Sequence, residues 1–140
     1  MKRYLTFTVA DLSLAIPVDR VAEVAPIPQI TRVPRPARHI EGLVPLRGRT
    51  IPLVDLRKRL GLVNPMASQD SRMIIALAGE RREPLGFIVD AVGEILSVED
   101  TERPVRDGAP WVDPGLLLGA LEVQGRQVLL PDLAKLADLA

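Results

Sequence analysis

The sequence predicts a mainly β protein with two related halves, each a small barrel or sandwich of about five short strands. Apolar residues recur at period two in short runs, which is typical of half-buried strands. Two segments of the first half recur in the same order in the second half, which indicates an internal duplication. No long amphipathic helix is apparent, so a fold of alternating strands and helices is not expected.

The longer repeated segment is Gly42–Leu62, GLVPLRGRTIPLVDLRKRLGL, which is identical to Gly119–Leu139 at eight of 21 positions. Each copy has two short apolar runs around a turn that contains glycine. This pattern predicts a hairpin, because glycine tolerates positive φ. In the first copy we expect Asp55 to cap a short helix that begins at Leu56 and ends at Gly61.

The shorter repeated segment is Leu14–Val24, LAIPVDRVAEV, which is identical to Leu85–Ile95 at five of 11 positions. The offset between copies is 71 here and 77 in the longer segment, so six residues are inserted between the repeated segments of the second half. We therefore predict a single domain over residues 1–140, composed of approximate repeats 1–66 and 71–140.

The remaining elements follow from local patterns. Tyr4–Val9 and Leu12–Ile16 both alternate, which predicts an N-terminal hairpin. Val18–Val24 fits either one helical turn or a twisted strand, because its apolar residues are three apart. Glu99–Gly115 is acidic, rich in proline and contains the only tryptophan, and we expect an exposed loop there. Asp132–Leu139 predicts a short terminal helix.

Composition narrows the possible chemistry. Apolar residues make up 47% of the chain but aromatic residues only 3%, so the predicted core is aliphatic. The absence of cysteine excludes disulfides and thiolate chemistry, and it fits a cytosolic address. His39 is the only histidine, so a histidine-based catalytic pair or metal site is not expected. No apolar run reaches 18 residues, so no membrane-spanning helix is predicted.

Charge is balanced overall but uneven along the chain. Residues 31–60 hold eight basic residues and two acidic ones, a local charge of +6. This face is either simply solvated, or it binds an acidic protein or a nucleic acid. The basic stretch has no aromatic residue for base stacking, so nucleic acid is not expected. The basic residues are Arg32, Arg35, Arg38, Arg47, Arg49, Arg57, Lys58 and Arg59.

Differences between the two copies suggest functional residues. Arg47 aligns with Gln124, although the following glycine is kept in both copies. The turn therefore needs the glycine but not the arginine, and Arg47 becomes a candidate for binding. Glu23, which has a counterpart in Glu94, could form a bidentate ion pair with Arg47. Aliphatic residues of the proline-rich stretch could line a groove between the two units: Ile27, Ile30, Val33 and Ile40.

Two motifs carry a family resemblance. The first runs through Ala15-Ile16-Pro17-Val18 to Val21 and Glu23, and the second is Gly42–Leu62, with its Leu-Arg-Gly turn and Asp-Leu-Arg helix start. With Gly86–Ile95, these motifs resemble the CheW-like family of adaptor proteins in bacterial chemotaxis-type signalling. Pro45 stands where that family usually has asparagine.

The resemblance implies two five-stranded SH3-like barrels with short capping helices, and no catalysis, metal or cofactor. It implies an adaptor, located in the cytoplasm at receptor–kinase arrays, that links the cytoplasmic tip of chemoreceptors (methyl-accepting chemotaxis proteins) to the regulatory domain of a CheA-type histidine kinase. By the same resemblance the polar contact residues are Glu23, Arg47 and Asp90. The candidates for an apolar groove are Val21, Ile27, Val33, Val44 and Val92.

Two alternatives remain open at this point. One is a receptor-only variant that does not bind the kinase. The other is a barrel that binds a polyanion or nucleic acid through the Arg32–Arg59 face. The receptor, the kinase, the behaviour under control and the oligomeric state are not specified by the residues.

Overall fold

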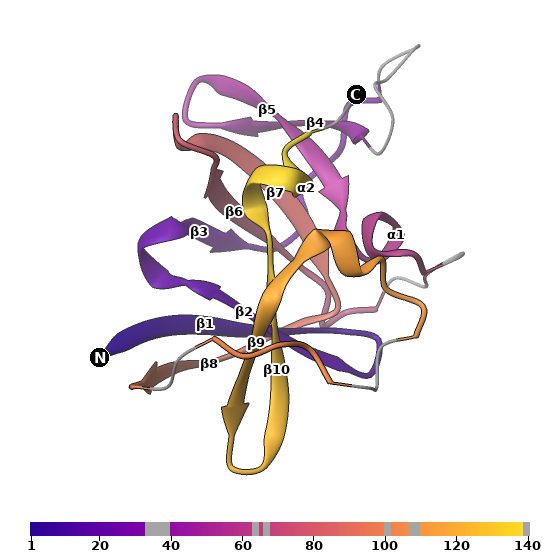
Figure 1. The fold of residues 1–140 in the computed structure, drawn as a ribbon. Helices are drawn as coiled ribbons and strands as arrows, with labels where there is room; N and C mark the ends of the chain where they lie inside the picture. The colour runs from indigo at the N-terminus through magenta and orange to yellow at the C-terminus, as the bar shows by residue number, and fades with distance from the viewer. Residues whose placement is uncertain (33–39, 63–64, 66–67, 100–101, 107–109, 139–140) are drawn as a thin grey trace.

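The computed structural model describes residues 1–32, 40–62, 65, 68–99, 102–106 and 110–138 (Figure 1). They form β-strands joined by short helices, which confirms the predicted fold class. The strands are β1 (Lys2–Val9), β2 (Leu12–Pro17), β3 (Val21–Ala25), β4 (Ile40–Leu46), β5 (Arg49–Asp55), β6 (Arg72–Ala78), β7 (Glu83–Val89), β8 (Ala91–Val98), β9 (Leu117–Val123) and β10 (Arg126–Pro131). The helices are η1 (Val18–Arg20), α1 (Leu56–Leu60), η2 (Pro114–Leu116) and α2 (Leu133–Leu136).

The strands form two five-stranded sheets with the same internal order. One sheet, which we call barrel A, has the order β8-β1-β2-β10-β9; the other, barrel B, has the order β3-β6-β7-β5-β4. The two orders coincide when each strand number is shifted by five. In each sheet one pair is parallel, β2 with β10 and β5 with β7. Hairpins β4–β5 and β9–β10 project at opposite ends of the molecule (Figure 1).

Each barrel takes strands from both halves of the sequence. Hairpin β1–β2 lies beside β8 and β10, and hairpin β6–β7 lies beside β3 and β5. The chain crosses from barrel A to barrel B through η1 and returns through the single residue Asp90, between β7 and β8. The approximate repeats in the sequence therefore do not correspond to one barrel each.

A short backbone bridge closes each sheet beyond its edge strand. In barrel B, Thr31 and Leu43 exchange two hydrogen bonds, 2.8 and 3.0 Å between nitrogen and oxygen. In barrel A, Arg103 and Ala120 do the same, both at 2.8 Å. Leu43 and Ala120 are 77 residues apart, as the duplication requires, so the two closures are equivalent. Closure satisfies backbone groups that an open edge would leave unpaired.

Close approach at these bridges explains a glycine that both repeats keep. A Cβ atom on Gly42 would lie 2.5 Å from Ile30 Cγ2 and 2.6 Å from the Thr31 carbonyl oxygen. A Cβ atom on Gly119 would lie 2.7 Å from the Arg103 carbonyl oxygen. A side chain at either position would therefore push the closing segment away from the sheet.

Each sheet buries side chains on both of its faces. The central core lies between the sheets and includes Phe7 and Leu14 from barrel A, and Ile74 and Phe87 from barrel B. Each barrel also has an interior of its own. Barrel B is filled by Val44, Ile51, Leu53, Met73, Ile75 and Ile88. Barrel A has a smaller set, which comprises Tyr4, Ala15, Leu121, Val128 and Leu130.

The helix ends confirm the local predictions. The Asp55 carboxylate accepts the backbone N–H of Arg57 at 3.1 Å and caps α1. Gly61 ends that helix with a φ of 126°, which favours glycine. Asp132 caps α2 in the same way, through the N–H of Lys135 at 3.2 Å.

Two local predictions are refined. The ambiguous stretch Val18–Val24 contains both structures, because η1 covers its first three residues and β3 the rest. The prediction of an exposed loop over Glu99–Gly115 is wrong at its end, where Val112 is only 6% exposed. Trp111 packs against the central core, because this segment crosses α1 and Asp113 donates its N–H to the Leu60 carbonyl at 3.3 Å. None of the helices in the described part of the chain is long and apolar enough to cross a membrane.

Replacing Gly42 should show that barrel closure limits stability. We expect Gly42→Ala to lower the free energy of unfolding by about 1–3 kcal/mol, because the added methyl group overlaps the closing segment. The measurement is urea denaturation followed by circular dichroism. Gly48→Ala is the control: Gly48 has a φ of 80° but nothing within 4 Å of a Cβ atom, so it reports left-handed strain alone. A smaller loss for Gly42→Ala than for Gly48→Ala would contradict this explanation.

Candidate functional site

Arg47 occupies an exposed turn whose backbone does not require an arginine. Arg47 and Gly48 connect β4 to β5 with φ values of 48° and 80°. Gln124 and Gly125, which connect β9 to β10, have nearly the same values, 51° and 77°. The two hairpin tips share one conformation but present different side chains. Among the described residues, Arg47 has no ion pair or hydrogen bond, so its guanidinium is available to a partner.

Glu23 lies on β3, the edge strand of barrel B, and is half-buried. Its register partner is Ile75 of β6. No ion pair joins Glu23 to Arg47 in the described residues, so the sequence-based expectation of such a pair is not met in this conformation. Both side chains therefore remain candidates for contacts with another molecule.

The apolar candidates fall into three environments. Val21 and Val92 are half-buried against the central core, and they are equivalent positions 71 residues apart. Ile27 packs against the interior of barrel B. Val44 is fully buried in that interior at 0% exposure, so the prediction that it lines a groove is wrong. Val33 lies outside the described residues.

Asp90 takes part in a buried charge cluster that the sequence analysis did not identify. Arg57 donates to both carboxylate oxygens of Asp55, from Nε at 2.9 Å and from Nη2 at 2.8 Å. Its Nη1 donates to Asp90 Oδ1 at 3.1 Å. The other oxygen of Asp90 accepts the backbone N–H of Ala10 at 2.6 Å. The cluster thus joins α1 and β5 of barrel B to the β1–β2 turn of barrel A.

The two central members of this cluster are buried, so removal of one partner would leave a buried charge unpaired. Both Arg57 and Asp55 are 4% exposed. The hydrogen bond that Arg57 donates to Asp55 is the main cause that raises the pKa of Arg57, and the charge of Asp90 and the hydrogen bond that it accepts act in the same direction. Since the pKa of Arg57 is raised above the already high value of an ordinary guanidinium, the side chain stays charged at every pH at which the protein would be studied. Titration of this arginine therefore does not switch the cluster.

The sequence predicts Arg57 on the basic surface, and this prediction is wrong because Arg57 is buried. The clue was a difference between the repeats, because Ala134 stands at the equivalent position of the second copy. The positive charge of Lys58 on this surface is balanced by an ion pair, because its Nζ lies 2.8 Å from Glu41 Oε1. Arg32, Arg47 and Arg49 remain exposed, whereas Arg35 and Arg38 lie outside the described residues.

Metal ligands do not gather in the described part of the chain: no group of three or more His, Cys, Asp or Glu side chains could hold an ion there. His39 lies outside the described residues. The two barrels, the central core and the exposed turn at Arg47 are features of a small β-barrel binding domain.

Comparisons with known proteins assign that domain to a family. A family model described as "CheW-like domain" matches residues 3–140. The chain therefore belongs to the CheW-like domain family.

Several similar proteins match nearly the whole length of this chain. The chemotaxis protein CheW of Rhizobium meliloti is 29% identical over 133 residues, which cover 94% of this chain and 84% of that protein. CheW of Thermotoga maritima is 29% identical over 134 residues, covering 96% and 86%. The scaffolding protein TtCheW from Thermoanaerobacter tengcongensis has a similar structure, with a TM-score of 0.86, 30% identity and coverage of 98% of this chain and 92% of that one.

Removing the arginine of the charge cluster should strongly destabilise the protein. We expect Arg57→Ala to lower the free energy of unfolding by about 3–5 kcal/mol, because it leaves Asp55 buried without its partner. Chemical denaturation provides the measurement. Lys58→Ala is the matched control on the same helix, and it should change stability by less than about 1 kcal/mol because its ion pair is exposed. Similar losses for the two variants would show that the cluster contributes no more than a surface pair.

Proposed function

We propose that this protein is a non-catalytic adaptor that couples chemoreceptors to a CheA-type histidine kinase in a chemotaxis or motility pathway. The observation that carries the proposal is the family match over residues 3–140, supported by relatives named chemotaxis protein CheW along almost the entire chain. The proposed partners are the cytoplasmic tip of a receptor and the regulatory domain of the kinase. The proposed location is the cytoplasm, at receptor–kinase arrays.

Arg47 is the central residue of the proposed contact surface. Arg47 is exposed on a turn, and the equivalent turn of the other barrel has the same backbone conformation with Gln124 in its place. The fold therefore does not require an arginine side chain at this position. Arginine is frequent among residues that dominate binding energy, because its planar guanidinium binds carboxylates in a bidentate geometry. We therefore propose that Arg47 binds an acidic group on the partner.

The other proposed contact residues differ in how accessible they are. Glu23, Val21 and Val92 are half-buried and can each present part of their surface. The side chain of Asp90 is 29% exposed, but both carboxylate oxygens already accept hydrogen bonds. We assign Asp90 a contact only at that exposed edge. Ile27 and Val33 complete the proposed set of contact residues. Val44 is excluded from it because its side chain is buried.

The alternatives predict different partners. A receptor-only variant would bind the receptor tip and not the kinase. A polyanion binder would use the Arg32–Arg59 face, but that face is weaker than the sequence suggested, since Arg57 is buried and Lys58 pairs with Glu41. The adaptor proposal is therefore favoured over polyanion binding.

Titration calorimetry distinguishes these functions. The protein is titrated with the receptor tip and the kinase regulatory domain, separately and then together, and with duplex DNA at two salt concentrations. The adaptor proposal expects binding to both proteins, each with a Kd near micromolar, or about −8 kcal/mol. Binding to the receptor alone would support the variant. Binding only to DNA, with a steep loss of affinity on adding salt, would overturn the adaptor proposal.

Arg47→Ala should weaken partner binding without loss of stability. We expect the receptor or kinase Kd to rise by about tenfold or more, the effect of losing a charged hydrogen-bonding anchor. The thermal unfolding midpoint should change by less than about 2 °C, because an exposed turn residue contributes little to stability.

Gln124→Ala is the matched control, since it makes the corresponding change in the same turn of the other barrel. It should leave both affinities unchanged. Equal weakening by the two substitutions, or a large loss of stability with unaltered affinity in Arg47→Ala, would assign Arg47 a structural role.

A further inference from the structure

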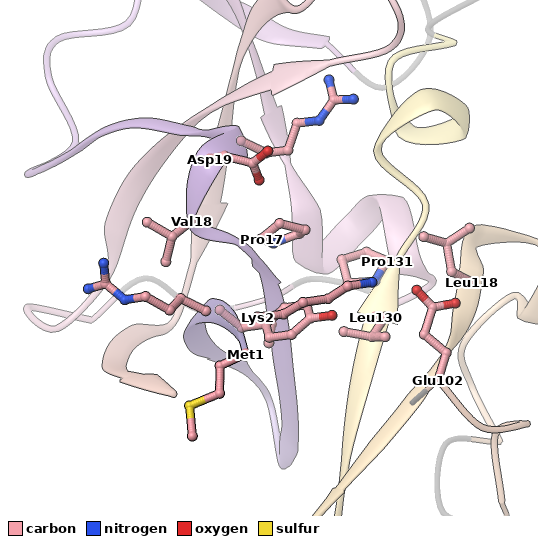
Figure 2. Close-up of a pocket in the computed structure, with 13 residues that line it drawn as sticks. Met1, Lys2, Pro17, Val18, Asp19, Glu102, Leu118, Leu130 and Pro131 are labelled. Carbon is pink, nitrogen blue, oxygen red and sulfur yellow. The ribbon is translucent and has the colours of Figure 1, made fainter. Parts of the chain in front are cut away.

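A pocket of about 560 Å³ opens at one end of barrel A (Figure 2). The start of β1, the ends of β2 and β10, η1 and the start of β9 surround it. Its floor consists of Tyr4, Ala15 and Leu130, which belong to the interior of the barrel. Leu118 and Glu102 stand at one side of the mouth, and Met1 and Val18 at the other (Figure 2). The size is typical of a ligand-binding site.

At the corresponding end of barrel B, a residue of the chain itself packs against the barrel interior. The closing bridges make Thr31 equivalent to Arg103, and so Ile30 equivalent to Glu102. In barrel B, Ile30 packs against the interior residues and approaches Gly42. In barrel A, Glu102 is exposed and lines the open pocket. Barrel A therefore lacks the aliphatic side chain that completes barrel B.

A second substitution at the same mouth supports this comparison. Leu118 is 58% exposed, the most exposed large apolar side chain among the described residues after Met1. Its counterpart 77 residues earlier is Glu41, which forms an ion pair with Lys58 at the surface of barrel B. In barrel B, the aliphatic Ile30 packs inside and Glu41 lies at the surface. In barrel A, the equivalent residues are the acidic Glu102 and the exposed Leu118.

We infer that the open end of barrel A binds an aliphatic side chain on an extended segment of another protein, in the manner in which Ile30 occupies barrel B. Barrel B thus makes within the chain, through Ile30, the kind of apolar contact that barrel A makes with a partner. Exposed leucine at the mouth and an apolar floor provide the hydrophobic contact.

Charged groups at the mouth favour a polypeptide over a small apolar molecule. Lys2 and Arg3 are exposed beside the pocket, as are Asp19 and Glu102, and no ion pair within the described residues uses these four side chains. Arg20 is engaged instead, because it donates to the carbonyls of Leu77 and Gly79 at 3.2 and 2.8 Å. A mouth with both signs of charge around an apolar floor suits a segment with polar residues on both sides of the aliphatic one. This inference does not depend on the proposed function, because none of the proposed contact residues lines the pocket.

A peptide that copies the internal segment tests the inference. The probe is a fluorescent peptide with the sequence of residues 25–32, APIPQITR, titrated into the full chain and followed by anisotropy. We expect saturable binding with a Kd of about 0.1–1 mM, in line with one or two aliphatic anchors. Amide chemical-shift changes should cluster around Tyr4, Ala15 and Leu130. No saturable binding, or shifts confined to barrel B, would overturn the inference.

Glu102→Ile is the decisive variant, because it gives barrel A the residue that barrel B already has. It should raise the thermal unfolding midpoint by about 3–6 °C and weaken peptide binding by about tenfold or more. Glu102→Gln is the control, since it removes the charge without adding an aliphatic side chain, and it should weaken peptide binding far less than Glu102→Ile does. Unchanged binding by a folded Glu102→Ile variant would refute the inference.

A surface substitution provides an independent test should Glu102→Ile fail to fold. Leu118→Glu changes an exposed side chain, so the fold should be retained. It should weaken peptide binding by about fivefold or more, since it places a charge at the apolar mouth. Equal affinity of Leu118→Glu and the unmodified protein would contradict a site at this end of the barrel.

Discussion

The structure depends on the exchange of hairpins between the two halves of the chain. Hairpin β1–β2 completes barrel A, whose other strands come from the second half, and hairpin β6–β7 completes barrel B, whose other strands come from the first. The outer faces of the two sheets then bury each other in the central core. Neither half holds a complete sheet by itself, so the barrels form together. Such non-local pairing has a high loop-closure cost and predicts slow folding relative to a helical protein of this size.

Equivalent positions of the two repeats differ in what the fold requires of them. Some residues serve the fold in both barrels, whereas others are free to vary. The pairs Gly42/Gly119 and Asp55/Asp132 are kept, because closing bridges and helix caps are needed in both barrels. At three of the positions that differ, Arg47 corresponds to Gln124, Arg57 to Ala134 and Ile30 to Glu102. The first difference leaves a guanidinium with no ion pair or hydrogen bond to the described residues, the second builds the charge cluster, and the third opens a pocket. A duplicated fold thus acquires distinct surfaces through changes at a few positions.

Local chemistry made the strands, turns and caps predictable, whereas pairing and burial were not. Alternation identified the hairpins, but it does not specify which distant strands become parallel neighbours, as β2 and β10 do. Val44 was misassigned because both faces of the sheet are buried, so alternation does not distinguish an interior residue from one at a groove. Arg57 was misassigned because a basic residue in a short amphipathic helix is usually solvated. In the fold its guanidinium is buried against Asp55 and also pairs with Asp90, which is 33 residues away in the sequence.

The main role of the charge cluster is to fix the position of the two barrels relative to each other. Asp90 is the single residue between β7 of barrel B and β8 of barrel A, and its carboxylate also binds the N–H of Ala10 in the β1–β2 turn. Arg57 therefore fixes the crossing point directly to α1 of barrel B. A hydrophobic contact at this point would tolerate sliding, because it is not directional. Bidentate and charge-assisted hydrogen bonds set both distance and angle. For a protein that presents different surfaces on its two barrels, this directional link keeps those surfaces in one relative orientation, which is the property that an adaptor requires.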